Sequence, residues 1–102
     1  MITITMHRDK KHRYTGFTIS GHADYDEAGS DIVCAAVSAL SQTALLGLMQ
    51  YASQDVPYEV NDGFLSVQVP EPCEASQIIL GTMVAGLEQI VRQYGEYVVL
   101  DS

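Results

Sequence analysis

Basic residues are scarce in this sequence, and most of the few that occur lie together. Four of the five lysines and arginines fall within residues 8–13, whereas twelve of the thirteen acidic residues lie outside that segment. A chain with this balance repels a phosphate backbone, so we expect no nucleic-acid partner. It would attract a basic protein or peptide and speed their encounter, unless the charge serves only to keep a small apolar protein soluble.

Cysteines and long apolar runs are also scarce. The two cysteines, Cys34 and Cys73, allow at most one disulfide. The N-terminal sequence MITITMHRDK alternates apolar and polar residues, unlike a signal peptide, and no segment is apolar for long enough to suggest a membrane span. We therefore expect a cytoplasmic protein with reduced thiols and no membrane partner.

The chain is long enough for one domain with its own core. It has 102 residues, of which 47% are hydrophobic, and it shows no repeat or linker, so we expect residues 1–102 to be a single domain. Residues 1–7 and 14–22 have the two-residue alternation of half-buried strands, which makes 8–13 the tip of a hairpin. From residue 31 to about residue 53, apolar residues recur at the spacing of a helix.

The second half of the chain repeats this arrangement. The segment NDG separates strands at 58–60 and 64–69 and is a strong hairpin signal, because Asn, Asp and Gly tolerate positive φ angles. A second helix starts within residues 70–76 and ends at Gly95, and residues 97–102 form a last strand. The order β-β-α-β-β-α-β predicts an α+β fold, in which a mostly antiparallel sheet packs with two long helices. The buried faces expected for the two helices consist of Val33, Val37, Leu40, Ala44, Leu48 and Tyr51, and of Ile79, Met83, Leu87, Ile90 and Tyr94.

Cys34 falls in the first turn of the first predicted helix, whether Ser30 or Asp31 is the N-cap. Unpaired N–H groups at a helix start favour an anion such as a thiolate by roughly 0.3–2 kcal/mol. That is too little to ionise an ordinary thiol fully near neutral pH, whereas a neighbouring imidazolium has a larger effect. Cys34 is therefore a candidate nucleophile if a histidine lies beside it.

His22 is the candidate partner, because it ends the second predicted strand one short loop before the helix. A loop of this length closes the gap at modest entropic cost. Cys34 would attack a carbonyl carbon, and His22 would take the thiol proton and later give it to the leaving amine. Free N–H groups of the helix start would bind the oxyanion. Strict alternation turns His22 away from the apolar face of its strand, so this geometry requires Gly21 to twist the chain.

The loop between His22 and the helix has no apolar period and carries three acidic residues. We expect it to be exposed and to act as a mobile lid that orders over a substrate. The expected lid consists of Ala23, Asp24, Tyr25, Asp26, Glu27, Ala28, Gly29 and Ser30.

Both members of the candidate pair also have plain structural interpretations. Cys34 could be an inert small hydrophobe in a helix, and His22 could be a surface residue at a strand end. Cys73 is a rival nucleophile, because it too opens a helix. However, its neighbours Glu71 and Glu74 are expected to disfavour a thiolate.

A metal site formed by His22, Cys34 and either Asp31 or Asp24 is the other chemical interpretation. The H-x11-C spacing is not a recognised zinc pattern, and structural zinc needs four ligands, so we expect no metal and no other cofactor. Asp31 could orient His22 or could only cap the helix. It shares a helix face with Cys34 and Ser38, at i, i+3 and i+7, which makes Ser38 a further candidate.

The segments GHA (21–23) and GSDIVCAAVSAL (29–40) together resemble the ribosomal-processing cysteine protease family. The pattern G-H…G-x-D-I-V-C-A-A-x-S is specific, and the likeness covers nearly the whole chain. It implies a homodimeric Cys-His endopeptidase that removes a short N-terminal extension from a large-subunit ribosomal protein. By this resemblance His22 is the base and Cys34 the nucleophile. The roles of the other matching positions are less clear; these are Gly21, Asp31 and Ser38.

The resemblance also implies what the substrate looks like. The sequence cleaved by the family is apolar and aromatic and precedes a basic body, which would suit an apolar groove on an acidic protein. A function of another class stays open, namely a non-catalytic module that binds a basic ribosomal protein or nascent peptide. In that case Cys34 would merely be packed in the core.

Overall fold

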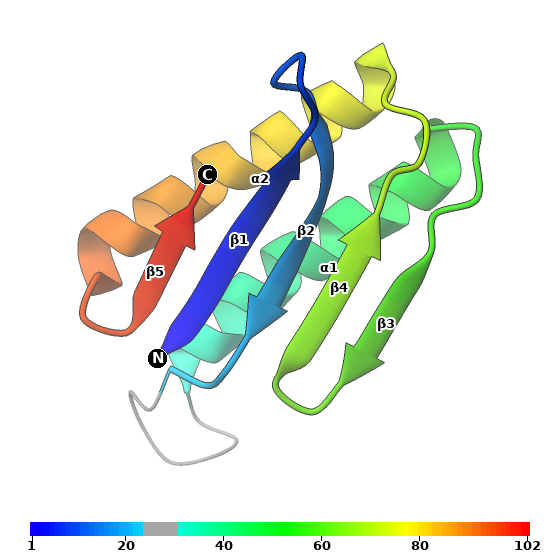
Figure 1. Ribbon diagram of the computed structural model, residues 1–102. Coiled ribbons are helices and arrows are strands. Elements are labelled where there is room, and N and C mark those ends of the chain that lie inside the picture. The colour runs from blue at the N-terminus through cyan, green and yellow to red at the C-terminus, as the bar shows by residue number, and fades with distance from the viewer. Residues whose placement is uncertain (24–30) are drawn as a thin grey trace.

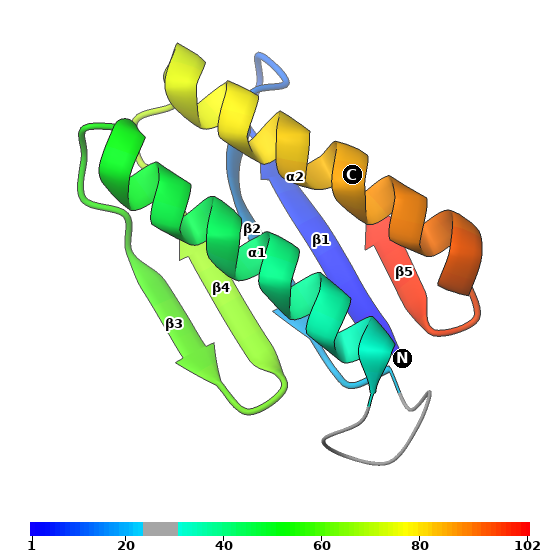
Figure 2. The same cartoon turned by 180° about the vertical axis from the view of Figure 1, so that it is seen from behind.

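Two helices cover one face of a five-stranded sheet (Figures 1 and 2). The computed structural model describes residues 1–23 and 31–102. Its elements are β1 (Ile2–Arg8), β2 (Tyr14–Ser20), α1 (Ile32–Tyr51), β3 (Tyr58–Asn61), β4 (Phe64–Gln68), α2 (Glu74–Tyr94) and β5 (Val98–Asp101). The α+β class and the order β-β-α-β-β-α-β are therefore confirmed.

The strands lie in the order β3-β4-β2-β1-β5. The β1–β2, β2–β4 and β3–β4 pairs are antiparallel, and β5 runs parallel to β1. Because β4 pairs with β2, the turn between β3 and β4 lies beside the C-terminal end of β2 (Figure 1). The candidate site forms where these two segments meet.

Cross-strand rows of apolar side chains form the sheet's half of the core. Phe17 pairs with Met6 on one side and with Val67 on the other, and all three are buried. Ile19 similarly connects buried residues of β1 and β4. Side chains in register on neighbouring strands point to the same face, so these rows form a continuous apolar layer under the helices.

The helices bury a face somewhat different from the expected one. On α2 the buried apolar residues are Leu80, Met83, Val84 and Leu87, whereas the expected Ile90 is only half-buried. Each helix packs on both the sheet and the other helix, so its contact surface is wider than a single apolar stripe. A correction applies to Tyr51, which is 68% exposed, because α1 ends there and the chain that follows buries Ala52 and Val56 instead.

Helix α1 has 20 residues and a mean hydropathy of 1.9, so by length and composition it could cross a membrane. On that measure the expectation that no segment is apolar for long enough was wrong. The helix lies against the sheet and against α2, and its buried residues include Val33, Val37 and Leu48 (Figure 2). One third of its apolar window is buried in this packing, and Ile32, Leu46 and Met49 are exposed.

Candidate active site

The start of α1 fixes the backbone at Cys34. Asp31 is the N-cap, and its Oδ1 accepts the N–H of Val33 at 2.9 Å and the N–H of Cys34 at 3.0 Å. Cys34 thus lies in the first turn, as expected. The expectation that the N–H groups of this turn are free to bind an oxyanion was wrong for these two, because the cap already occupies them.

The thiol of Cys34 accepts a hydrogen bond from the chain that follows β2. The backbone N–H of Ala23 donates to Cys34 Sγ at 3.2 Å. This contact fixes the sulfur next to the backbone that leads out of β2, beside His22. Cys34 is half-buried, which leaves its sulfur accessible from one side.

Gly21 turns the chain so that His22 reaches the site. Its φ is +92°, and a Cβ there would collide with the carbonyl oxygen of Met1. The N–H of Gly21 donates to the carbonyl of Gly63 at 2.9 Å, and the N-terminal ammonium of Met1 donates to the carbonyl of His22. The twist assumed from the sequence is therefore confirmed, and the backbone of His22 is held from two sides.

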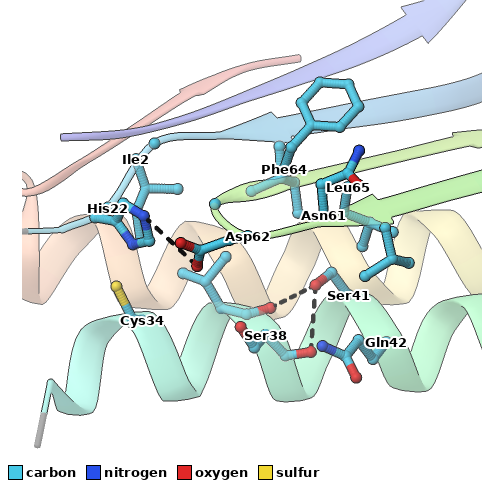
Figure 3. Close-up of a pocket in the computed structure, with 15 residues that line it drawn as sticks. Ile2, His22, Cys34, Ser38, Ser41, Gln42, Asn61, Asp62, Phe64 and Leu65 are labelled. Carbon is cyan, nitrogen blue, oxygen red and sulfur yellow. Dashed lines mark hydrogen bonds and ion pairs between the residues drawn. The ribbon is translucent and has the colours of Figure 1, made fainter. Parts of the chain in front are cut away.

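The imidazole of His22 lies against the tip of the β3–β4 hairpin. Its Nε2 is 3.9 Å from Oδ1 of Asp62. In Figure 3, Cys34 lies on the helix side of the ring and Asp62 on the hairpin side. The ring is more than half exposed, so it can still reach a substrate.

Cys34 and His22 line one cavity of about 270 Å³ between α1 and the β3–β4 hairpin (Figure 3). Its apolar lining includes Val37, Val60 and Leu65. Its polar lining consists of Ser38, Ser41, Gln42, Asn61 and Asp62. A cavity with an apolar wall and a few convergent polar groups is typical of a site that binds an organic ligand or a peptide segment.

The other expected site residues have different places. Ser38 lines the cavity one turn after Cys34. Asp31 caps α1, and the cavity lining does not include it. Sequence reasoning missed Asp62, which it treated as part of a turn and no more. Only the pairing of β4 with β2 brings that turn to His22, and the sequence gives no direct signal for this pairing.

The profile of the family described as cysteine protease Prp matches residues 1–99. The chain belongs to this family. A ribosomal processing cysteine protease Prp from Staphylococcus aureus is 34% identical over 105 residues, which cover 99% of this chain and 98% of that protein. A protein with the same name from Bacillus subtilis is 28% identical over 101 residues, which cover 92% and 90% of the two chains.

Solved structures agree with this assignment to the Prp family. A crystal structure of the S. aureus essential ribosomal processing protease Prp with a covalently linked product peptide superposes with a TM-score of 0.87 at 28% identity, covering 99% of this chain and 98% of that one. A structure of the same protease with a substrate peptide has a TM-score of 0.82 at 27% identity, with the same coverage. A Streptococcus mutans protein gives 0.84 at 28% identity, covering 99% and 92%.

Most of the expected lid of this Prp-family chain lies outside the described residues. Only Ala23 belongs to the described part, and it differs from the expectation. Its side chain is 2% exposed, and its N–H is bonded to Cys34 Sγ. Ala23 is therefore part of the packed site and not of an exposed loop. The lid residues 24–30 stay a prediction.

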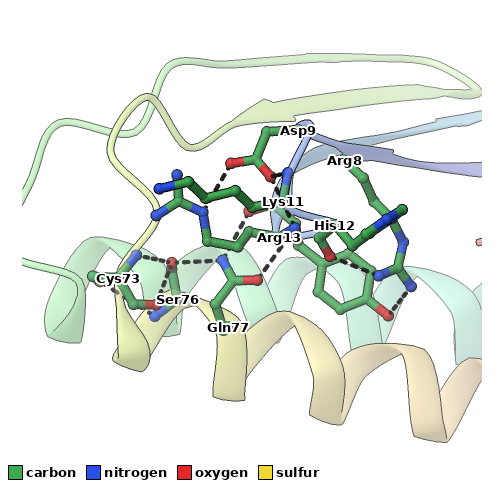
Figure 4. A network of polar contacts seen from close by, with 9 residues as sticks. Arg8, Asp9, Lys11, His12, Arg13, Cys73, Ser76 and Gln77 are labelled. Carbon is green, nitrogen blue, oxygen red and sulfur yellow. Dashed lines mark hydrogen bonds and ion pairs between the residues drawn. The ribbon is translucent and has the colours of Figure 1, made fainter.

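Cys73 caps the other helix, at the opposite end of the molecule from Cys34 (Figure 1). Its Sγ accepts the N–H of Ser76, and the Ser76 hydroxyl accepts the N–H of Cys73, which completes a capping box (Figure 4). The Ser76 N–H lowers the pKa of the Cys73 thiol below its ordinary value. The expectation that the surroundings of Cys73 disfavour a thiolate was therefore wrong, because the hydrogen bonds from Ser76 favour it.

The described residues, 1–23 and 31–102, contain no group of three or more histidine, cysteine or acidic side chains placed to hold a metal ion. The metal-site interpretation also involved Asp24, which lies outside these residues.

Proposed function

We propose that this protein is a cysteine endopeptidase that removes a short N-terminal extension from a large-subunit ribosomal protein. The observation that carries the proposal is that Cys34 and His22, from opposite walls, line one cavity in a chain of the Prp family. The S. aureus relative is named a ribosomal processing protease and has been crystallised with a substrate peptide. This relationship supports the same substrate class here.

In the proposed reaction Cys34 is the nucleophile and His22 is the general base. His22 takes the thiol proton as Cys34 Sγ attacks the scissile carbonyl carbon, and the N–H of Ala23 holds the sulfur in place. His22 then gives this proton to the leaving amine, and the C–N bond breaks to leave a thioester on Cys34. Water, deprotonated by His22, hydrolyses the thioester and restores the free thiol.

The walls of the cavity fit an apolar peptide segment. Val60 lines the cavity, and Tyr58, two residues earlier in β3, lies on the same face of that strand. Both side chains are more than half exposed, at 53% and 54%. An apolar segment that covers them removes this area from water, which stabilises the complex by roughly 25 cal/mol per Å². The acidic body of the protein complements the basic body of a ribosomal protein.

The proposal has further parts. We propose that the protein acts as a homodimer, as the resemblance to the family implies. From the composition and motifs of the chain we also propose that it works in the cytoplasm, without a nucleic-acid or membrane partner and without a cofactor. Light scattering coupled to gel filtration measures the oligomeric state. A mass of one chain at micromolar concentration would contradict it.

The direct test is incubation of the protein with the N-terminally extended ribosomal protein of the same organism, read by mass spectrometry. We expect one cut near the N-terminus of the substrate by the wild type. Cys34→Ala and His22→Ala should each lose nearly all activity, while circular dichroism shows an unchanged fold. Cys73→Ser is the matched control, because it removes the other thiol and leaves a residue that caps a helix well. It should cleave like the wild type.

Two outcomes would contradict the proposal. One is cleavage by the folded Cys34→Ala variant, which would remove Cys34 as the nucleophile. The other is a wild type that binds the extended protein tightly without cutting it. That result would favour the non-catalytic binding module.

A further inference from the structure

We propose that the β3–β4 turn, Asp62–Gly63, positions His22. The imidazole ring packs on the backbone of Gly63, and the carboxylate of Asp62 is the acceptor that orients the ring. The inference rests on the proposed function, because it assigns a purpose to the orientation of a general base. Neither residue belongs to the Gly-His…Cys motif. Both come to His22 from a different hairpin through the pairing of β4 with β2.

The imidazole ring can pack on Gly63 because this residue has no side chain. A Cβ at this position would lie 2.7 Å from Nε2 of His22 and 3.2 Å from Cε1, so the ring packs directly on the backbone of the turn. The φ of Gly63 is +70°, which most other residues avoid. Its carbonyl accepts the N–H of Gly21, the residue before His22. The turn therefore contacts both the backbone and the ring of the His22 segment.

Asp62 supplies the orienting charge. Its Oδ1 faces Nε2 of His22 at 3.9 Å, from the hairpin side of the ring, whereas Cys34 lies on the helix side (Figure 3). A carboxylate at this place favours the tautomer that carries its proton on Nε2, which leaves Nδ1 as the unprotonated base for the thiol. Catalytic hydrogen bonds are often long in free enzymes and shorten when the substrate binds.

The influence of Asp62 on His22 is limited because Asp62 is exposed to solvent. Asp62 is 99% exposed, so solvent screens its charge and the pair is weaker than a buried one. We therefore expect a loss of several-fold in turnover and not the loss of thousands-fold that follows removal of a buried orienting aspartate. The other charged or titratable groups described around His22 are Cys34 on α1, Asp31 at its N-cap and the Met1 ammonium, which is bonded to the His22 carbonyl.

The test compares Asp62→Asn with Asp55→Asn. Asparagine keeps the turn propensity of position 62 and removes only the charge. Asp55 is exposed and precedes β3, at the end of the hairpin away from His22, so its variant controls for the change in net charge. We expect Asp62→Asn to lower kcat by about 3- to 10-fold at unchanged KM. Asp55→Asn should match the wild type, and Asp62→Glu should recover part of the loss.

A second readout does not require activity. The ¹⁵N resonances of the His22 ring report which nitrogen carries the proton. We expect the wild type to favour Nε2–H and Asp62→Asn to show a more even mixture, with Asp55→Asn unchanged. Identical ring resonances in Asp62→Asn and the wild type would overturn the proposal, and so would a change in KM alone. If the wild type cleaved no ribosomal protein, the proposed function would fail, whereas the ring resonances would still decide the role of Asp62.

Discussion

The two thiols of this chain both lie at the N-terminus of a helix, so the helix dipole cannot be what separates a nucleophile from a structural cysteine. Cys34 has the N–H of Ala23 on its sulfur and shares a cavity with His22. Cys73 is occupied in a capping box, and the N–H of Ser76 lowers the pKa of its thiol. Alkylation alone therefore discriminates poorly between them, because hydrogen bonds favour the thiolate of the structural Cys73.

Asp31 provides a prediction about the same helix start. Its Oδ1 binds two backbone N–H groups, so we expect it to be a cap. Asp31→Asn should keep turnover within about twofold of the wild type, because asparagine caps almost as well. Asp31→Ala should lose about 0.5–2 kcal/mol of unfolding free energy, measured in urea. A strong loss of turnover in Asp31→Asn at unchanged stability would show instead that Asp31 orients His22.

At the scale of residues, the sequence predicted the positions of those site residues that depend on local structure. Cys34 could be placed in a first turn from helix periodicity and capping, and His22 could be placed one short loop before it. Asp62 could not be predicted, because its role depends on two hairpins lying side by side. The occupation of the Val33 and Cys34 N–H groups was not predicted either, although a capping Asp31 produces it.

At the scale of elements, the two helices meet through small residues. A Cβ on Gly47 of α1 would be in ordinary contact with Ile79, and one on Gly86 of α2 would lie 3.1 Å from Leu40. Helix α2 is the element that packs most closely against α1. Periodicity located both helices, but it could not show which residues face the sheet and which face the other helix.

Two glycines of α2 give a matched prediction. A Cβ on Gly81 would meet nothing within 4 Å, whereas one on Gly86 would press on Leu40. Alanine is better than glycine inside a helix by about 0.5–1 kcal/mol. Gly81→Ala should therefore raise the free energy of unfolding by about that amount, seen as a higher urea midpoint at an unchanged m-value. Gly86→Ala should gain less or lose stability. An equal gain in both variants would contradict the close helix contact at Leu40.

At the scale of the whole molecule, the strand order and the charges set how a substrate approaches. The basic hairpin tip of residues 8–13 is ordered by Asp9, which accepts from the N–H of Arg13 and pairs with its guanidinium (Figure 4). The tip lies at the opposite end of β1 and β2 from His22 and Cys34 (Figure 1). The end that carries the candidate site therefore belongs to the part of the chain with twelve acidic residues and a single arginine. The sequence shows that the basic residues are clustered, but only the strand order shows that this cluster lies away from the candidate site.

The last prediction separates the roles of the two parts of the proposed substrate, its apolar N-terminal segment and its basic body. Packing of an apolar segment on Val60 and Tyr58 is directional and fixes the register, whereas diffuse charge only speeds encounter. Alanine at aromatic residues just before the cut should therefore abolish cleavage at any salt concentration. Removal of the basic body should lower kcat/KM mainly at low salt, since the screening length is only about 8 Å at physiological ionic strength. The measurement is kcat/KM for the full substrate, the aromatic-to-alanine variant and the isolated apolar peptide, each across a salt series. An isolated peptide cut as fast as the full protein at low salt would contradict steering. Efficient cleavage of the variant without aromatics would contradict the apolar groove.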